Sequence, residues 1–379
     1  MKKIGLLSIV AALSVLAYSC NKKEPATSNH SGTATTAKPN LPAATHKYFE
    51  QGLRTPLANE KATLGRVLFY DKQLSLNNAV ACASCHRQEF AFSDNVQFSR
   101  GFENKQTGRN SMAIQNLFVT NRFNGGIIDP LQPNTGGNQS LFWDGRSTGL
   151  LDLVLRPVSN HIEMGIENVD VLPEKLARLD YYPALFKTAY GSEGITVQRI
   201  KESLVMFMAA IKSENTRFDA AEEGNGQLNA LETQGHSLFF TKYNCNSCHQ
   251  VTVDGYSGMS NPLMDIGLDS SYADKGLGTI TGVPNDNGRF RIPNLRNVSL
   301  TGPYMHDGRF KTIEDVLNHY SKGISASKNL DERLKDDYGK PMRMNISKNE
   351  MTAIIAFLNT LTDSKMITDP MLSDPFKAN

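Results

Sequence analysis

The chain contains 379 residues, of which 40% are hydrophobic, and carries a formal net charge of +2 at pH 7. This length accommodates two domains of ordinary size. A charge so close to zero gives no reason to expect nucleic acid as a partner. Four of the five cysteines form two C-x-x-C pairs, and the fifth is Cys20 near the N-terminus.

The N-terminal segment has the pattern of a signal peptide. Two lysines precede an apolar run from Ile4 to Ala17, which is too short to span a bilayer comfortably. Cys20 at the end of this run resembles the lipidated cysteine of a bacterial lipoprotein, and plain secretion with an incidental Cys20 is the alternative. Residues 21–45 contain almost no large apolar side chains and predict a disordered tether. We therefore expect a signal peptide over 1–20 and a lipid-anchored protein in the periplasm.

A repeated motif dominates the remaining sequence. It is C-x-x-C-H, which is typical of c-type haem attachment, because two thiols form thioethers to one porphyrin and the histidine reaches the iron. A single copy could also be half of a zinc site or a redox dithiol. A Cys₄ zinc site would require both pairs to converge on one metal and would leave both histidines unexplained. The repeat therefore predicts two haem c groups, one held by Cys82, Cys85 and His86, the other by Cys245, Cys248 and His249.

Helical patterns precede both motifs. Residues 59–70 place Leu64, Val67 and Leu68 on one face, and residues 229–243 repeat this spacing. A helix that leads into C-x-x-C-H resembles the cytochrome c fold. Strand signals are sparse, so we expect a mainly α fold of two cytochrome c-like domains with long loops.

Further patterns set the expected domain limits. Residues 195–214 are strongly helical, and Ser347 with Glu350 forms a capping box that opens a last helix. Stretches rich in Gly, Asn and Pro predict long loops over 104–140 and 250–300. The predicted units are an N-terminal haem domain, a C-terminal haem domain and a tail, at 46–216, 217–365 and 366–379.

Several longer motifs carry a family resemblance. They are Phe142-Trp143-Asp144-Gly145-Arg146, Glu163-Met164-Gly165, Arg291-Ile292-Pro293-Asn294-Leu295-Arg296-Asn297 and Gly302-Pro303-Tyr304-Met305-His306-Asp307-Gly308. In this order they resemble the bacterial di-haem cytochrome c peroxidase family, including the MauG-type enzymes that mature methylamine dehydrogenase. The resemblance covers about residues 50–362. It implies a peroxidatic N-terminal haem and a C-terminal haem that receives electrons.

The resemblance also assigns individual roles. Glu163 matches the distal acid–base residue, since a carboxylate can move the proton that peroxide cleavage requires. Trp143 matches the tryptophan that lies between the two haems. A calcium ion between the domains would be bound through Asn110, Thr301 and Pro303, and oxygen ligands of this kind suit that cation.

Two departures from the family pattern concern the first haem. The family often has a distal histidine there, but this sequence has no histidine between His86 and His161. The first iron is therefore expected to be open at rest, unless His161 or Met112 reaches it. Leu153 replaces a family glutamine and makes the distal pocket less polar.

A further departure from the family pattern concerns the sixth ligand of the second haem iron. Peroxidases of the family often place a methionine fourteen residues after the histidine of the His-Asp-Gly motif, whereas the MauG-type enzymes have tyrosine there. Counting from His306 leads to Tyr320. A phenolate lowers the potential of haem iron. Met342, Met344 and His319 are the rival ligands.

The expected function is reduction of hydrogen peroxide to water at the N-terminal haem, with electrons passed through the C-terminal haem from a small donor protein, a cytochrome c or a cupredoxin. One alternative is MauG-type oxidation of a protein or organic substrate through a high-valent di-haem state. Another is a di-haem electron carrier without chemistry of its own, which would need both irons saturated by protein ligands. The sequence leaves the oligomeric state open, a homodimer included.

Overall fold

The computed structural model describes residues 38–41, 47–49, 55–117, 131, 140–249 and 263–377. Residues from Lys38 onward form one compact unit. The predicted leader with Cys20 lies outside the described residues. Within them, no helix combines the length and the apolar character that crossing a membrane requires.

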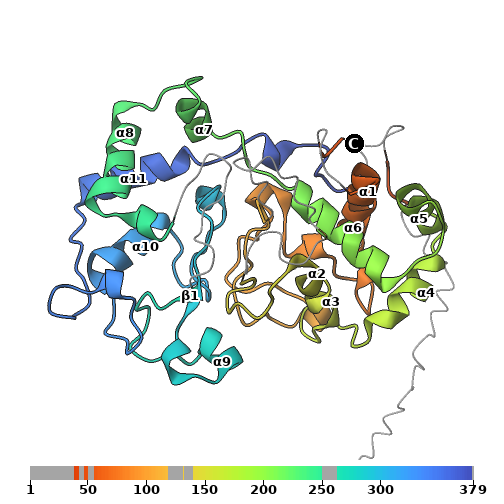
Figure 1. The fold of residues 1–379 in the computed structure, drawn as a ribbon, viewed down its shortest axis with the longest axis horizontal. Coiled ribbons are helices and arrows are strands. Elements are labelled where there is room, and N and C mark those ends of the chain that lie inside the picture. The colour runs from red at the N-terminus through yellow and green to blue at the C-terminus, as the bar shows by residue number, and fades with distance from the viewer. Residues whose placement is uncertain are drawn as a thin grey trace, which may run out of the picture. The chain divides into compact units, whose positions relative to one another are not determined.

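The fold is mainly helical, as predicted (Figure 1). In the described part of the chain, two short strands, β1 (Leu263–Met264) and β2 (Phe290–Arg291), pair antiparallel with Leu263 opposite Arg291. The α-helices are α1 (Ala58–Tyr70), α2 (Leu150–Leu153), α3 (Arg156–Ser159), α4 (Leu172–Ala177), α5 (Tyr182–Tyr190), α6 (Val197–Ala210), α7 (Arg217–Glu222), α8 (Ala230–Ser237), α9 (Leu277–Thr281), α10 (Ile313–Asn318) and α11 (Lys348–Asn359).

The first core is built on the packing of α1 against α6 (Figure 1). The apolar face of α1 is buried as the sequence predicted. The two helices approach closely at Gly65, where an added Cβ would lie 1.9 Å from the backbone oxygen of Ser203 and 2.9 Å from the Cβ of Phe207. Only glycine fits this crossing, because any side chain would collide with the backbone of α6.

The second core repeats this arrangement with α8 and α11. An added Cβ at Gly235 would lie 1.9 Å from the backbone oxygen of Ala353 and 2.9 Å from the Cβ of Phe357. The predicted capping box is present, since Glu350 accepts a 2.9 Å hydrogen bond from the Ser347 amide. The predicted single helix over 229–243 is α8 followed by a π-helical turn, Leu238–Lys242.

The last residues of the chain return to the first core. The segment 366–377 follows the second core in sequence, yet Met366 and Leu372 are buried in the first. Tyr70 of α1 donates a 2.8 Å hydrogen bond to the Leu372 carbonyl. Much of the stretch that the sequence assigned to a C-terminal tail is therefore packed against the first core.

A buried ion pair fixes the R-I-P-N-L-R-N segment in the second half. The fully buried Arg296 donates bidentately to Asp219 of α7 at 2.7 and 2.5 Å. The adjacent Asn297 accepts from the Asp363 amide at 2.6 Å and donates to Ser213 at 3.0 Å. These contacts give the loop a defined position although it contains little regular structure.

Candidate active site

The first C-x-x-C-H motif begins with a 3₁₀ turn, Cys82–Ser84, which brings its reactive side chains together. The His86 amide donates to the Cys82 carbonyl at 3.0 Å, so the histidine follows the turn directly. His86 Nδ1 lies 2.9 Å from the carbonyl oxygen of Phe92, which acts as its acceptor. This bond fixes the tautomer and leaves the lone pair on Nε2, as a haem-ligating histidine requires.

The first pair of cysteines carries neutral thiols. Burial raises the pKa of Cys82 to about 12 and that of Cys85 to about 11. Redox dithiols work as thiolates, which this surrounding opposes. Among the described residues, no group of three His, Cys, Asp or Glu side chains could hold a metal ion. The donor set therefore fits covalent haem attachment better than it fits zinc.

Glu163 lies beside this motif, on the turn that follows α3. Its amide donates to the Asn160 carbonyl at 3.1 Å, and its Oε1 accepts from the Asn160 side chain at 3.2 Å. Burial raises the pKa of Glu163, and the positive charge of Arg146 partly opposes this rise. The negative charge of Glu163 in turn contributes to the raised pKa values of Cys82 and Cys85. A carboxyl group therefore faces the first attachment site.

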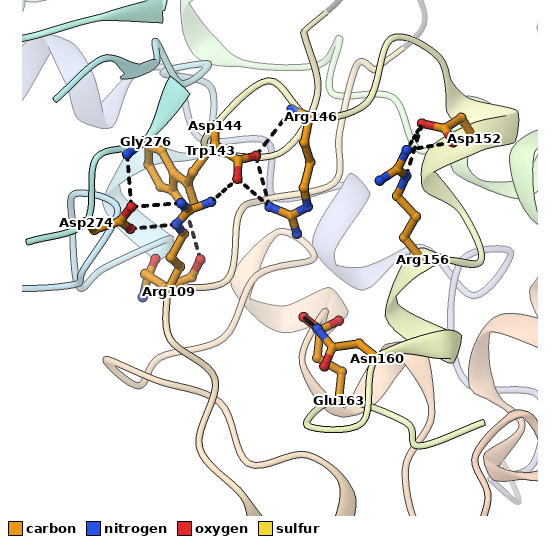
Figure 2. A network of polar contacts seen from close by, with 11 residues as sticks. Arg109, Trp143, Asp144, Arg146, Asp152, Arg156, Asn160, Glu163, Asp274 and Gly276 are labelled. Carbon is orange, nitrogen blue, oxygen red and sulfur yellow. Dashed lines mark hydrogen bonds and ion pairs between the residues drawn. The ribbon is translucent and has the colours of Figure 1, made fainter. Parts of the chain in front are cut away.

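A chain of ion pairs connects this region with the second half (Figure 2). Arg146 donates to both oxygens of the buried Asp144, at 2.9 and 3.0 Å. Arg109 donates to Asp144 at 2.6 Å and to both oxygens of Asp274, at 2.7 and 2.9 Å. The roles of Arg109 and Asp274 were not predicted, because no local pattern shows that residues 165 positions apart will pair.

Trp143 lies where segments of the two halves meet. Its Nε1 donates to the Asn110 carbonyl at 2.9 Å, and its own carbonyl accepts from the Arg291 amide at 2.8 Å. The Asn110 amide donates to the His306 carbonyl at 2.8 Å, which brings Asn110 against the loop that contains Thr301 and Pro303.

His306 itself is buried and stacks on Phe290, with ring centroids 3.7 Å apart and an interplanar angle of 12°. The histidine of the His-Asp-Gly motif is thus packed where segments of the two halves meet.

The second C-x-x-C-H motif has the same local geometry as the first. Its 3₁₀ turn is Cys245–Ser247, and the His249 amide donates to the Cys245 carbonyl at 2.9 Å. His249 Nδ1 lies 3.1 Å from the Pro293 carbonyl, so Nε2 again keeps its lone pair. Burial lowers the pKa of His249 to about 4 and raises that of Cys245 to about 12. Both motifs therefore present a neutral imidazole and half-buried, neutral thiols.

Tyr320 approaches the second motif from a π-helical turn, His319–Gly323, that continues α10. Burial raises the pKa of Tyr320, and the nearby Cys248 and Cys245 add to the rise. Tyr320, Met342 and Met344 all pack around one small apolar cluster formed by Ile324, Leu330 and Leu334. The structure thus gathers the predicted ligand and two of its rivals in one place.

His319, the third rival ligand, and Met264 also lie near the second motif. His319 Nε2 lies 3.0 Å from the Ile266 carbonyl, so ligation through this atom would cost that hydrogen bond. Met264 of β1 places its sulfur 4.0 Å from Cys248 Sγ. The sequence analysis missed Met264, because it lies in a Gly- and Asn-rich stretch without a motif.

Comparisons with known proteins agree with this geometry. The family model "Di-haem cytochrome c peroxidase" matches residues 59–227, and "Cytochrome c" matches 233–362. The methylamine utilization protein MauG of Methylorubrum extorquens is 30% identical over 322 residues, which cover 84% of this chain and 82% of that protein. The chain belongs to the di-haem cytochrome c peroxidase family.

Two further relatives show the range of this family. The cytochrome c551 peroxidase of Nitrosomonas europaea is 29% identical over 313 residues, covering 81% of each chain. A solved MauG-like protein associated with microbial copper homeostasis aligns with a TM-score of 0.72 and 31% identity, over 89% of this chain and all of that one. Membership makes this chain an oxidoreductase that carries two haem c groups.

Proposed function

We propose that this protein reduces hydrogen peroxide to water at the haem of the first half, with electrons delivered through the haem of the second half. Cys82, Cys85 and His86 would hold the first haem, while Cys245, Cys248 and His249 would hold the second. The bound haems would supply the iron where peroxide reacts and the path for the two electrons that its reduction consumes, which come from the donor protein. The corresponding domains span 46–216 and 217–365.

The position of Glu163 supports this proposal most directly. Splitting peroxide into water requires a proton to move from one peroxide oxygen to the other. A carboxyl group with a raised pKa binds such a proton more readily than an exposed one, and Asn160 holds the Glu163 side chain in place. His161 is exposed, which disfavours it as a second protein ligand of the first iron. The other residue considered for that position, Met112, has its backbone beside His86.

Electron supply would follow the contacts between the halves. Trp143 is hydrogen-bonded to Asn110 in the first half and to Arg291 in the second. We therefore propose Trp143 as the aromatic group through which electrons pass from the second haem to the first. The reductant would be a small electron-donor protein, a cytochrome c or a cupredoxin.

Replacement of Glu163 by glutamine tests the proposal. Glu163→Gln keeps the side-chain shape but cannot exchange a proton at pH 7. Peroxide turnover should fall by about two to four orders of magnitude, the usual contribution of a positioned acid–base group, with both haems retained. Glu167→Gln is the matched control, since Glu167 is exposed four residues away. A near-normal rate in Glu163→Gln would remove this residue from the mechanism.

Tyr320 supports a second candidate function. A tyrosine ligand would keep the second haem at low potential, which favours storage of oxidising equivalents over ready electron acceptance. The partly buried position of Tyr320 near Cys245 and Cys248 fits that role. The alternative activity is therefore MauG-type oxidation of a protein or organic substrate. Oxidation of both haems by peroxide in the absence of reductant would favour it.

The lipid anchor and the calcium ion are also proposals. Lipidation of Cys20 would attach the protein to a membrane on its periplasmic side, and Cys20→Ala should release it or block its processing. Membrane association that persists in this variant after a salt wash would contradict the anchor. Asn110, Thr301 and Pro303 remain the proposed calcium ligands, which calcium analysis of the purified protein tests.

A further inference from the structure

Two tyrosines of the first half share one buried carboxylate. Tyr181 and Tyr182 both donate their hydroxyl hydrogens to Oδ2 of Asp71, at 2.7 and 2.8 Å. The other carboxylate oxygen accepts from the Gln73 amide at 2.8 Å. Asp71 and Tyr182 are buried, and Tyr181 is half-buried. The phenol rings lie 4.7 Å apart, so the pair forms one compact aromatic unit.

This unit connects the first haem motif with the outer part of the domain. Asp71 follows the last residue of α1, and Tyr182 begins α5, which lies beside α1 (Figure 1). Cys82 packs against the same buried apolar core that contains Tyr182. Tyr182 therefore lies near a haem-attachment cysteine, whereas Tyr181 reaches towards the surface beside Phe376.

We propose that Tyr182 and Tyr181 are a redox relay that gives electrons to the first haem, with Asp71 as the proton acceptor. This inference rests on the proposed reaction of that haem with peroxide, which supplies the oxidant. The relay would be a one-electron oxidation site at Tyr181, Tyr182 and Asp71, which have no role in the proposed reduction of peroxide.

The proposed step balances in electrons and protons. Tyr182 loses one electron to the peroxide-oxidised haem, its O–H bond breaks, and the proton forms an O–H bond on Asp71 Oδ2. The products are a neutral tyrosyl radical, a neutral carboxylic acid and a haem reduced by one electron. Tyr181 then passes an electron to Tyr182, the proton on Asp71 Oδ2 returns to the Tyr182 oxygen, and the proton of Tyr181 takes its place on Oδ2. A one-electron reductant at the surface restores Tyr181, with the proton returned from Asp71.

Burial makes the proton acceptor necessary. Burial and the negative charge of Asp71 raise the pKa of Tyr182, so the phenol stays protonated until an electron leaves. A phenol that loses an electron must release its proton, and the donor–acceptor distance of 2.8 Å lies within reach of direct transfer. Two other tyrosines of this core, Tyr48 and Tyr70, donate to backbone carbonyls, which cannot take up a proton.

Electron paramagnetic resonance after rapid freezing tests the relay. The full-length protein with both haems is mixed with hydrogen peroxide without a reductant, and optical spectra of the first haem are recorded in parallel. The relay predicts a radical signal that narrows when the protein is grown with ring-deuterated tyrosine. It further predicts loss of this signal in Tyr182→Phe, together with slower decay of the peroxide-oxidised haem spectrum.

Two variants provide the controls. Tyr272→Phe removes a phenol that donates to Asp265 in the second half, and this variant should retain the signal. Asp71→Asn keeps both rings but removes the proton acceptor, and it should lose most of the signal. Haem content and circular dichroism verify that each variant is folded.

The outcomes separate the relay from the underlying reaction. A first haem that reacts with peroxide while wild type forms no tyrosyl radical would overturn the relay and leave the peroxidase proposal intact. A full radical signal in a folded Tyr182→Phe protein would also overturn the relay. A first haem that does not react with peroxide at all would overturn both proposals.

Discussion

The two halves of the molecule share a scaffold and differ in what faces it. In each half, a glycine allows two helices to cross closely, at Gly65 with α6 and at Gly235 with α11. In each half, a 3₁₀ turn carries the cysteines, and a backbone carbonyl holds Nδ1 of the histidine. The helix crossing, the 3₁₀ turn and the histidine hydrogen bond that position each haem-attachment motif are therefore the same in both halves.

The surroundings of the motifs are not repeated. The first motif lies beside Glu163, a carboxyl group with a raised pKa, whereas the second lies beside the partly buried phenol of Tyr320 and a group of methionines. A carboxyl group can exchange protons with a substrate, and a phenol or thioether can ligate iron. The comparison shows how one scaffold can support a reactive haem in one half and a saturated haem in the other.

The largest effects should come from breaking the shared scaffold. Gly65→Ala and Gly235→Ala each place a methyl group 1.9 Å from a backbone oxygen. Each should lower the free energy of unfolding by about 1–3 kcal/mol or more, the usual cost of overpacking a core. Urea unfolding followed by circular dichroism measures the loss.

Hydrogen exchange then locates the loss of stability, which should lie in α1 and α6 for Gly65→Ala and in α8 and α11 for Gly235→Ala. Gly108→Ala is the control, because no heavy atom lies within 4 Å of its added Cβ. If only one of the two glycine variants loses stability, the two helix crossings do not contribute equally to the stability of the protein.

A smaller and more local effect is expected from Tyr320. Tyr320→Met should raise the reduction potential of the second haem, because a thioether stabilises ferrous iron whereas a phenolate opposes it. Tyr320→Phe should change the low-spin spectrum of that haem and leave the first haem unaltered. Spectroelectrochemistry measures both variants, and Tyr338→Phe is the control, since Tyr338 is 87% exposed.

An unchanged potential in Tyr320→Phe would assign the ligand elsewhere. Met264, Met342 and Met344 would then be the next candidates, since all three lie near Tyr320 or Cys248.

Much of the fold could be predicted from local sequence. The helical period predicted α1 and α6 within a few residues of their ends, and the capping box predicted the start of α11. These signals are visible because helix formation and capping depend on residues three or four positions apart.

Long-range contacts explain what the sequence could not show. The return of Leu372 to α1 spans 302 positions, and the pairing of Arg109 with Asp274 spans 165. The carboxylate shared by Tyr181 and Tyr182 also depends on the approach of α5 to α1. Glu163 and Tyr320 were predicted through the family pattern, and their roles stay predictions.

The electron paramagnetic resonance spectrum of the resting, fully oxidised protein tests the contrast between the two haems most directly. We expect one high-spin ferric haem, which is open for peroxide beside Glu163, and one low-spin ferric haem, which is saturated by His249 and Tyr320. Glu163→Gln should leave both signals in place, whereas Tyr320→Phe should alter only the low-spin one. Two low-spin signals, with peroxide turnover appearing only after one-electron reduction, would contradict the account, because a protein ligand would then close the first haem as well.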